Sequence, residues 1–255
     1  MRTVLFHYHY FKNAGTSVDA VLQRNFGSRW IAKEFPSGHK SEMIAEWIKS
    51  NPQADAFSSH TALFPLPILE GVRVYPIVFI RHPLDRINSV YSFERTQKED
   101  TFGTLIAREH DLAGYILKRL EYESDRQLRN FHSDKLARLV PGPQEAELDR
   151  ALSALKQLPF VGIVEEFETS MAMLECKLRP LFPSFTVFTT HENASRTQGL
   201  SLEERLNKLR ETLGEDLWSH VLDANLADIA LYYAARVRAK NKSRTEFKDL
   251  ISAQQ

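Results

Sequence analysis

The sequence is poor in cysteine and has no excess charge of either sign. Its 255 residues include one cysteine, Cys176, so no internal disulfide can form, and no Cys/His grouping has zinc-site spacing. The 33 Lys and Arg residues balance the 33 Asp and Glu residues, which gives a net charge of zero. A neutral chain has no general field that would attract nucleic acid or an anionic membrane. Any anion must therefore be bound by a local site.

Long apolar runs and signal-peptide features are also missing. The longest internal apolar run, Val74 to Ile80, falls far short of the roughly 20 residues that span a bilayer. The start of the chain, Met1 to Tyr8, is too short in apolar residues and too rich in His and Tyr for a signal peptide. We therefore expect a soluble protein without membrane insertion, and the lone cysteine favours the cytoplasm. The oligomeric state cannot be predicted from these features.

Repeats, low-complexity tracts and Gly/Ser linkers are absent as well, which predicts one continuous domain over residues 1–255. The last seventeen residues, 239–255, are predicted to form a polar tail. A length of 255 residues fits one large domain.

The pattern of apolar residues predicts strands and helices in alternation. The predicted strands cover residues 3–10, 56–59, 74–80 and 160–164, and the predicted helices cover 18–26, 41–50, 83–91 and 167–178. The segment 100–156 is predicted to be mostly helical. Since Pro76 lacks a donor, the strand ladder is expected to begin near it. Alternation of this kind predicts an α/β fold with a central parallel sheet and helices on both faces. Ligands of such sheets collect at the carboxyl ends of the strands.

The first candidate motif runs from Phe11 to Ser17 between the first strand and the first helix. Its small residues would let backbone N–H groups surround an anion, and Thr16 and Ser17 add hydroxyl donors at a helix N-terminus. It is not a Walker A loop, because the lysine precedes the glycine. The structural alternative is an ordinary turn in which Thr16 or Ser17 caps the helix. The predicted anion-binding residues are Lys12, Asn13, Ala14, Gly15, Thr16 and Ser17.

The second candidate motif follows the apolar strand that ends at Ile80. Arg81 leaves the end of that strand, and Ser89 lies about two turns into the next helix, which suits a second phosphate group. Arg86 is as well placed to pair with Asp85 or Glu94 as to touch a ligand. Two anion sites on neighbouring strand ends imply a ligand with two separated phosphate groups.

Together these motifs resemble those of the sulfotransferases that use 3′-phosphoadenosine 5′-phosphosulfate (PAPS), in particular the carbohydrate branch that includes heparan 2-O-sulfotransferases. The 5′-phosphosulfate loop of that family is similar to Phe11–Ser17, with Phe11 in place of the usual proline. Its 3′-phosphate motif is matched by Arg81, Pro83, Arg86, Ser89 and Tyr91. Weaker similarities lie at residues 127–129, 160–167, 191–196 and 228–232. The resemblance implies a three-layer fold like that of P-loop NTPases, with Ser195 and Arg196 in a late loop that closes over the nucleotide.

The resemblance also implies an activity. PAPS would be the donor, adenosine 3′,5′-bisphosphate the product, and no metal would be needed for donor binding. Lys12 would meet the charge that grows on the departing phosphate. His60, which follows a short predicted strand, is the preferred base for the acceptor hydroxyl, and Glu94 and Glu166 are the next candidates. His7 and His9 share a strand face and are expected to be packing or supporting groups.

Other functions and several acceptors remain open. A P-loop kinase or NTPase is disfavoured because no Mg²⁺-holding Asp follows an apolar strand, and an inactive nucleotide- or glycan-binding module is a further alternative. A carbohydrate or glycoconjugate hydroxyl is the first choice of acceptor, and a small-molecule or lipid alcohol is the second. Cations between residues 93 and 143 either hold an acidic glycan or form a solvated helical surface. They are Arg95, Lys98, Arg108, Lys118, Arg119, Arg126 and Arg129. Four aromatic residues could stack on a base or sugar or lie in the core: Tyr8, Tyr10, Tyr91 and Phe93.

Overall fold

The computed structural model describes residues 1–188 and 199–252, with side chains as far as residue 241. The strands are β1 (Arg2–Tyr8), β2 (Trp30–Ala32), β3 (Ala56–Ser59), β4 (Val72–Ile80) and β5 (Gly162–Ile163). The helices in the first half are α1 (Gly15–Phe26), α2 (Ser41–Lys49), α3 (Pro83–Glu94), α4 (Phe102–Glu109) and α5 (Leu112–Leu120). Those in the second half are α6 (Phe131–Ala137), α7 (Glu147–Gln157), α8 (Phe167–Leu178), α9 (Leu202–Asp223) and α10 (Leu226–Ser252).

The strands form one parallel sheet in the order β2-β3-β1-β4-β5. The central pairs are in register with Leu5 opposite Ala56 on one side and Tyr75 on the other. The loops after β1, β3 and β4 therefore leave the same edge of the sheet, as expected for parallel strands. This confirms the predicted α/β class with a parallel sheet.

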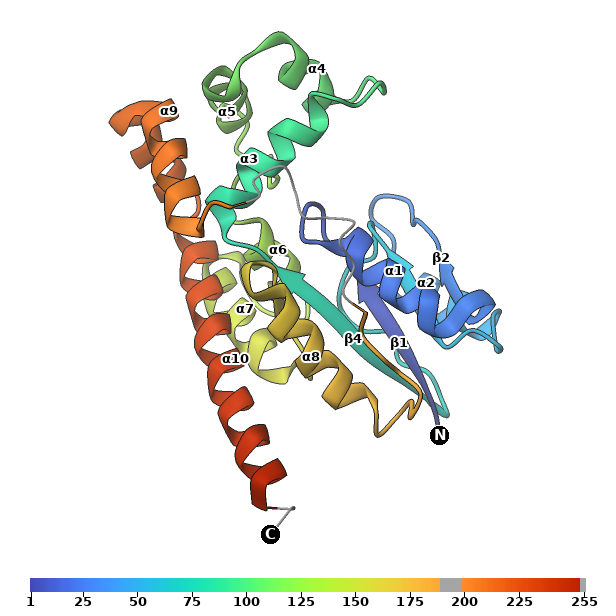
Figure 1. Ribbon diagram of the computed structural model, residues 1–255. Helices are drawn as coiled ribbons and strands as arrows, with labels where there is room; N and C mark the ends of the chain where they lie inside the picture. Colours follow the sequence, from blue (N-terminus) through green and yellow to red (C-terminus); the bar gives the residue numbers. More distant parts are fainter. Residues whose placement is uncertain (189–198, 253–255) are drawn as a thin grey trace.

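Helices cover both faces of the sheet, which was also predicted. On one face, α1 and α8 pack their apolar side chains, such as Val18 and Leu174, against Leu5 and Ile77. On the other face, a larger core joins α2, α6, α7 and α10 to the opposite side chains of β1 and β4. Figure 1 shows α1 and α8 running alongside β1 and β4, with α10 along the side of the molecule. Because side chains alternate along a strand, Val4, Phe6 and Tyr8 enter the larger core while Leu5 enters the α1 layer.

A third apolar cluster lies beyond the sheet. It joins α3, α4, α5 and α9 through residues such as Ile87, Tyr115 and Leu213. In Figure 1 these helices lie at the end of the molecule toward which the arrow of β4 points. They therefore stand beside the edge where the candidate motifs emerge.

Most predicted boundaries agree with the structure, and β3 and α8 agree at both ends. One detail, the start of the ladder near Pro76, was wrong. The ladder of β4 with β1 begins at Val72 and passes through Pro76. The missing donor is tolerated because β5 pairs only with Phe79 and Ile80, so the other side of β4 has no strand beside Pro76.

Other differences concern short or terminal elements. Strand β5 has two residues rather than five, and β2 was not predicted because three residues carry too little pattern. In the segment 239–255, expected to be a polar tail, helix α10 continues as far as Ser252. Within the part of the chain that the structure describes, no helix combines the length and the apolar character needed to cross a bilayer.

Candidate functional site

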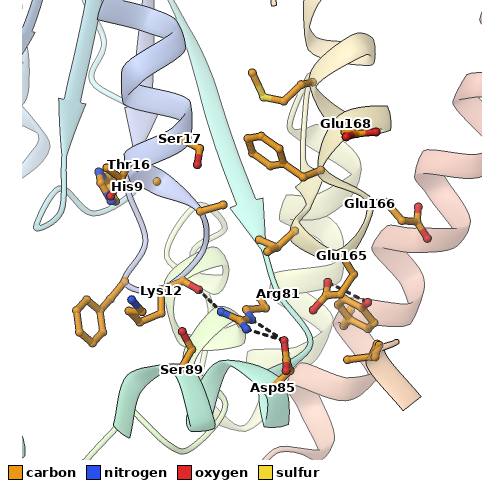
Figure 2. Close-up of a pocket in the computed structure, with 18 of the residues that line it drawn as sticks. His9, Lys12, Thr16, Ser17, Arg81, Asp85, Ser89, Glu165, Glu166 and Glu168 are labelled. Atoms are coloured by element: carbon orange, nitrogen blue, oxygen red, sulfur yellow. Dashed lines mark hydrogen bonds and ion pairs between the residues drawn. The ribbon is translucent and has the colours of Figure 1, made fainter. Parts of the chain in front are cut away.

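One cavity of about 1500 Å³ joins the two candidate motifs at the carboxyl edge of the sheet. Lys12, Gly15 and Thr16 line it from the first motif, and Arg81 and Ser89 line it from the second. Figure 2 shows Lys12 and Arg81 facing the same space, with Thr16 and Ser17 on one side and Glu165 and Glu168 across from them. Residues that are 64 or more positions apart thus meet because β1 and β4 are neighbours in the sheet.

The first motif forms a tight loop with unusual backbone angles. Lys12 and Ala14 have φ values of 61° and 59°, in the left-handed region that costs a residue with a side chain about 1 kcal/mol. Gly15 begins α1 directly after them. A Cβ atom at Gly15 would lie 1.9 Å from Cδ2 of His9, so only glycine fits beside this ring. Helix α1 begins at the cavity, and no side chain of the N-cap residue Ala14 caps its first turn.

The strained loop is held from beneath by a buried chain of hydrogen bonds. Asn13 donates to the carbonyl of Phe11, and its own Oδ1 lies 2.8 Å from His132 Nε2. His132 Nδ1 lies 3.0 Å from Asp228 on α10. Asn13 was predicted to bind the ligand, but its side chain is buried and does not line the cavity. It shapes the loop from inside because it is the residue between the two left-handed positions.

Lys12 is the side chain of this loop that brings charge to the cavity. Its Nζ lies 4.4 Å above the centre of the Phe93 ring. Burial lowers the pKa of Lys12, and the nearby Arg81 lowers it further. Two cations that repel each other across a cavity favour an anion between them.

Arg81 is held by an acidic residue that sequence reasoning did not assign to it. Its Nε lies 2.8 Å from Asp85, and Asp85 also accepts from Arg205 Nε at 2.8 Å. Burial would raise the pKa of Asp85, but the charges and hydrogen bonds of Arg81 and Arg205 lower it overall. One carboxylate therefore joins two arginines, and all three line the cavity. Arg205 lies on α9, 120 positions after Asp85, so no sequence spacing could have predicted it.

Arg86 plays a structural part, and neither of the two alternatives left open for it holds, because it bonds to other residues than Asp85 and Glu94 and does not line the cavity. Its side chain is buried, donates to the carbonyl of Phe11 and to Gln127, and lies 3.8 Å from the centre of the Phe131 ring. Burial lowers the pKa of Arg86 to about 9. Arg86 therefore ties the loop before Lys12 to the segment after α5.

His60 reaches the cavity from the end of β3, as its position after that strand predicted. Its Nδ1 lies 2.7 Å from Glu34, and its side chain is 53% exposed. Burial would raise the pKa of Glu34, but hydrogen bonds from His60 and Thr61 lower it. His60 is thus a half-exposed imidazole with a carboxylate on its Nδ1 side.

His9 forms a second imidazole–carboxylate pair beside the first. It faces α1, where its Nδ1 lies 2.7 Å from Asp19 Oδ2, while His7 Nδ1 lies 2.7 Å from Asp19 Oδ1. The rings of His9 and His60 are 3.8 Å apart between centres. His9 and His60 both line the cavity. His7, His9 and Asp19 are residues of metal-binding types and lie close enough together to hold a metal ion, and their Nδ1 atoms and carboxylate oxygens are joined to one another by hydrogen bonds.

The acidic wall of the cavity comes from the segment after β5. Glu165 accepts from the backbone N–H of His82 at 2.8 Å and from Tyr232, and burial raises its pKa. Glu166, one of the alternative bases, lines the cavity and pairs with Arg236 at 2.7 Å. Glu94, the other alternative, is buried away from the cavity against Arg119 and Tyr115, so it cannot serve as the base.

The remaining candidate residues differ in whether they line the cavity. Phe93 lines the cavity, whereas Tyr8, Tyr10 and Tyr91 are buried. Ser195 and Arg196 lie outside the described residues. The seven cations named above do not line the cavity, and several pair with neighbouring acids, as Lys118 does with Glu121 on the surface. This part of the chain therefore matches the solvated helical surface better than a cationic acceptor site.

Comparison with known proteins gives a relative but no activity. The chain is 42% identical over 241 residues to an "uncharacterized protein" of Archaeoglobus fulgidus. The chain belongs to the same family as this archaeal protein. The alignment covers 91% of this chain and 95% of its relative, so the two share nearly their whole length. No protein-family model matches the chain.

Proposed function

We propose that this protein is a PAPS-dependent sulfotransferase with a fold like that of P-loop NTPases. The proposal depends on one observation above the others: Lys12 with the start of α1, and Arg81 with Ser89, line a single cavity. Two anion-binding groups in one cavity suit a ligand with two separated phosphates, and PAPS has its 5′-phosphosulfate and 3′-phosphate in this relation. The sequence resemblance described above supports the same ligand.

The size of the cavity supports a reaction between two substrates. Ligand pockets of about 300–1,000 Å³ hold one small molecule, and this cavity of about 1500 Å³ is larger. The wall formed by Glu165, Glu166 and Glu168 is acidic, so a strongly anionic acceptor would be repelled there. We therefore propose a carbohydrate or glycoconjugate hydroxyl without a high negative charge, and a small-molecule or lipid alcohol as the second choice.

The chemical step is an in-line transfer of the sulfuryl group. The acceptor oxygen forms a bond to sulfur while the bond from sulfur to the 5′-phosphate oxygen breaks. The acceptor proton passes to His60, whose Nδ1 side is held by Glu34. The departing adenosine 3′,5′-bisphosphate keeps the electron pair, and Lys12 meets the charge that develops on its 5′-phosphate. In this scheme the protein binds the donor without a metal ion.

Calorimetric titration with adenosine 3′,5′-bisphosphate tests the proposal. We expect wild-type protein to bind it with micromolar affinity and to bind ATP with Mg²⁺ at least tenfold more weakly. Arg81→Ala and Lys12→Ala should each weaken binding by at least about tenfold, since each removes a charge-assisted contact. Arg138→Ala is a matched control for Arg81→Ala, because Arg138 also pairs with an acid four positions away but lies on the surface.

Two results of this titration would contradict the proposal. If the protein prefers ATP with Mg²⁺, or if Arg81→Ala binds the bisphosphate like Arg138→Ala, the sulfotransferase proposal fails. Preference for ATP would instead favour the kinase or NTPase alternative.

We propose the cytoplasm as the location because the chain has a single cysteine, which suits a reducing compartment.

A further inference from the structure

The ring of His9 is fixed at both of its edges. One edge is held by Asp19, which lies 2.7 Å from Nδ1. The other edge faces the start of α1, where a Cβ on Gly15 would lie 1.9 Å from Cδ2 and 2.1 Å from Nε2. The ring is buried, and Figure 2 shows it beside Thr16 at the beginning of the helix. Nε2 therefore lies against the helix N-terminus that would bind an anion.

Asp19 determines which nitrogen of His9 can titrate. Burial would raise the pKa of Asp19, but hydrogen bonds from His7, His9 and Ser58 lower it well below its usual range, so Asp19 is ionised. An ionised carboxylate only accepts hydrogen bonds, so His9 must donate its Nδ1–H to Asp19. The position that gains or loses a proton is then Nε2, next to Gly15. A proton on Nε2 would make the ring a cation that lies between Asp19 and an anion bound at the start of α1.

We propose that His9 takes up a proton on Nε2 when the donor nucleotide binds, and that the resulting imidazolium, held by Asp19, donates a hydrogen bond to the anionic 5′ group at the start of α1. This inference depends on the proposed function, because the anion is the 5′ end of that nucleotide. The proton comes from solvent, and no covalent bond changes. His9 then joins Lys12 as a direct contact of the transferred end of the donor, whereas His60 remains the base for the acceptor.

Other titratable groups around His9 could take up the same proton, so the test must separate them. His7 lies on the same strand, and its Nδ1 is already held by Asp19. His60 approaches from the end of β3 with its ring 3.8 Å away and with Glu34 behind it. Lys12 enters from the loop after β1, and its pKa is lowered by burial and by Arg81. Of these, His60 and Lys12 face the cavity and are the alternatives to exclude.

Proton uptake can be measured without an acceptor and without enzyme activity. The protein is titrated with adenosine 3′,5′-bisphosphate at pH 7.5 in buffers of different ionisation enthalpy, and the slope of the observed enthalpy gives the protons bound. We expect wild-type protein to take up between about 0.3 and 1 proton per bisphosphate. His9→Gln should abolish this uptake and weaken binding about tenfold. His60→Gln and Lys12→Arg should retain the uptake.

A second measurement covers the case in which a substitution disturbs the fold. For wild-type protein, the affinity for the bisphosphate should fall as the pH rises from 6 to 8.5, by up to about tenfold per pH unit. This decline should be missing in His9→Gln and present in His60→Gln, with thermal melting used to show that each variant is folded.

The outcomes separate the two proposals. Binding by wild-type protein without proton uptake, or with uptake that His9→Gln retains, overturns the role of His9 and leaves the proposed function intact. Uptake that disappears in His60→Gln but not in His9→Gln likewise overturns it and assigns the proton to His60. Failure of wild-type protein to bind the bisphosphate refutes the proposed function itself.

Discussion

The two imidazole–carboxylate pairs at the cavity have the same contact distance and very different surroundings. In each pair, an Nδ1 lies 2.7 Å from a carboxylate oxygen. The side chains of His9 and Asp19 are 10% and 16% exposed, whereas those of His60 and Glu34 are 53% and 50% exposed. Water screens an exposed pair and offers its partners other hydrogen bonds, so such a pair contributes little to stability. A buried pair is costly to break because its partners have no substitute.

Removing the carboxylate of the less exposed pair should give the largest loss of stability. Asp19→Ala leaves the Nδ1–H groups of His7 and His9 and the hydroxyl of Ser58 without their acceptor. We expect the free energy of unfolding to fall by about 4 kcal/mol. Glu34→Ala should cost less than about 1 kcal/mol, because that pair is half exposed. Urea unfolding followed by circular dichroism measures both, and equal losses would contradict the comparison.

His82 is a buried imidazole without a carboxylate partner, and it differs from the two pairs because its burial should make stability depend on pH. Burial lowers the pKa of His82 to about 4, and the nearby Asp85 only partly offsets this. In the unfolded chain the pKa of this histidine has its ordinary value of about 6.5. As the pH falls, the unfolded chain therefore binds the proton before the folded protein does, and acid favours unfolding. The contribution of the neutral His82 ring to the free energy of unfolding is complete above pH 6.5 and is lost as the pH falls toward 4. It amounts to about 2 kcal/mol between pH 7.5 and 5, and about 3 kcal/mol in total.

His82→Phe checks this assignment, because it keeps a ring against Tyr232 and removes the titration. Between pH 7.5 and 5, the variant should lose about 2 kcal/mol less stability than wild-type protein in urea unfolding. His60→Gln serves as the control and should follow wild-type protein. The assignment is wrong if His82→Phe shows the same acid dependence as wild-type protein.

Placing an extra carbon atom against the His9 ring should have a smaller effect on stability than removing Asp19. Gly15→Ala would place a Cβ 1.9 Å from the His9 ring, which Asp19 prevents from moving away. We expect a loss of about 2 kcal/mol from overpacking. Gly114→Ala in α5 is the control, since its nearest atom would lie 3.1 Å away and alanine favours the helix. Thermal melting of both variants provides the measurement, and a Gly15→Ala protein as stable as wild type would show that the ring can move.

The exposed pair should show the smallest effect on stability. His60→Gln is expected to change the free energy of unfolding by less than about 0.5 kcal/mol. Under the proposed function, the same change should leave affinity for adenosine 3′,5′-bisphosphate within about twofold and slow sulfuryl transfer by about 100-fold or more. Urea unfolding and calorimetry test the first two expectations. A large loss of stability would mean that His60 has a structural role.

Much of the site could be predicted because its residues follow strands. The carboxyl ends of parallel strands share one edge, so Lys12, His60 and Arg81 were expected at one site, and all three line the same cavity. Asn13 was assigned to the ligand because loop residues look alike in sequence. Its burial depends on His132, which comes from a helix more than a hundred positions later. Arg86 was misjudged for the same reason, since its partner Gln127 lies beyond α5.

Local patterns determined the elements of this protein, because strand and helix periodicity and turn residues act within a few positions. They were sufficient for the boundaries of β3 and α8, the buried stripe of α1 and the parallel sheet with helices on both faces. Only the tertiary structure decided which charges meet. Asp19 joins His7 and His9 because α1 packs on that face of β1, and Arg205 reaches Asp85 because α9 packs on α3. Such pairs depend on how helices pack in space, and no local spacing records that arrangement.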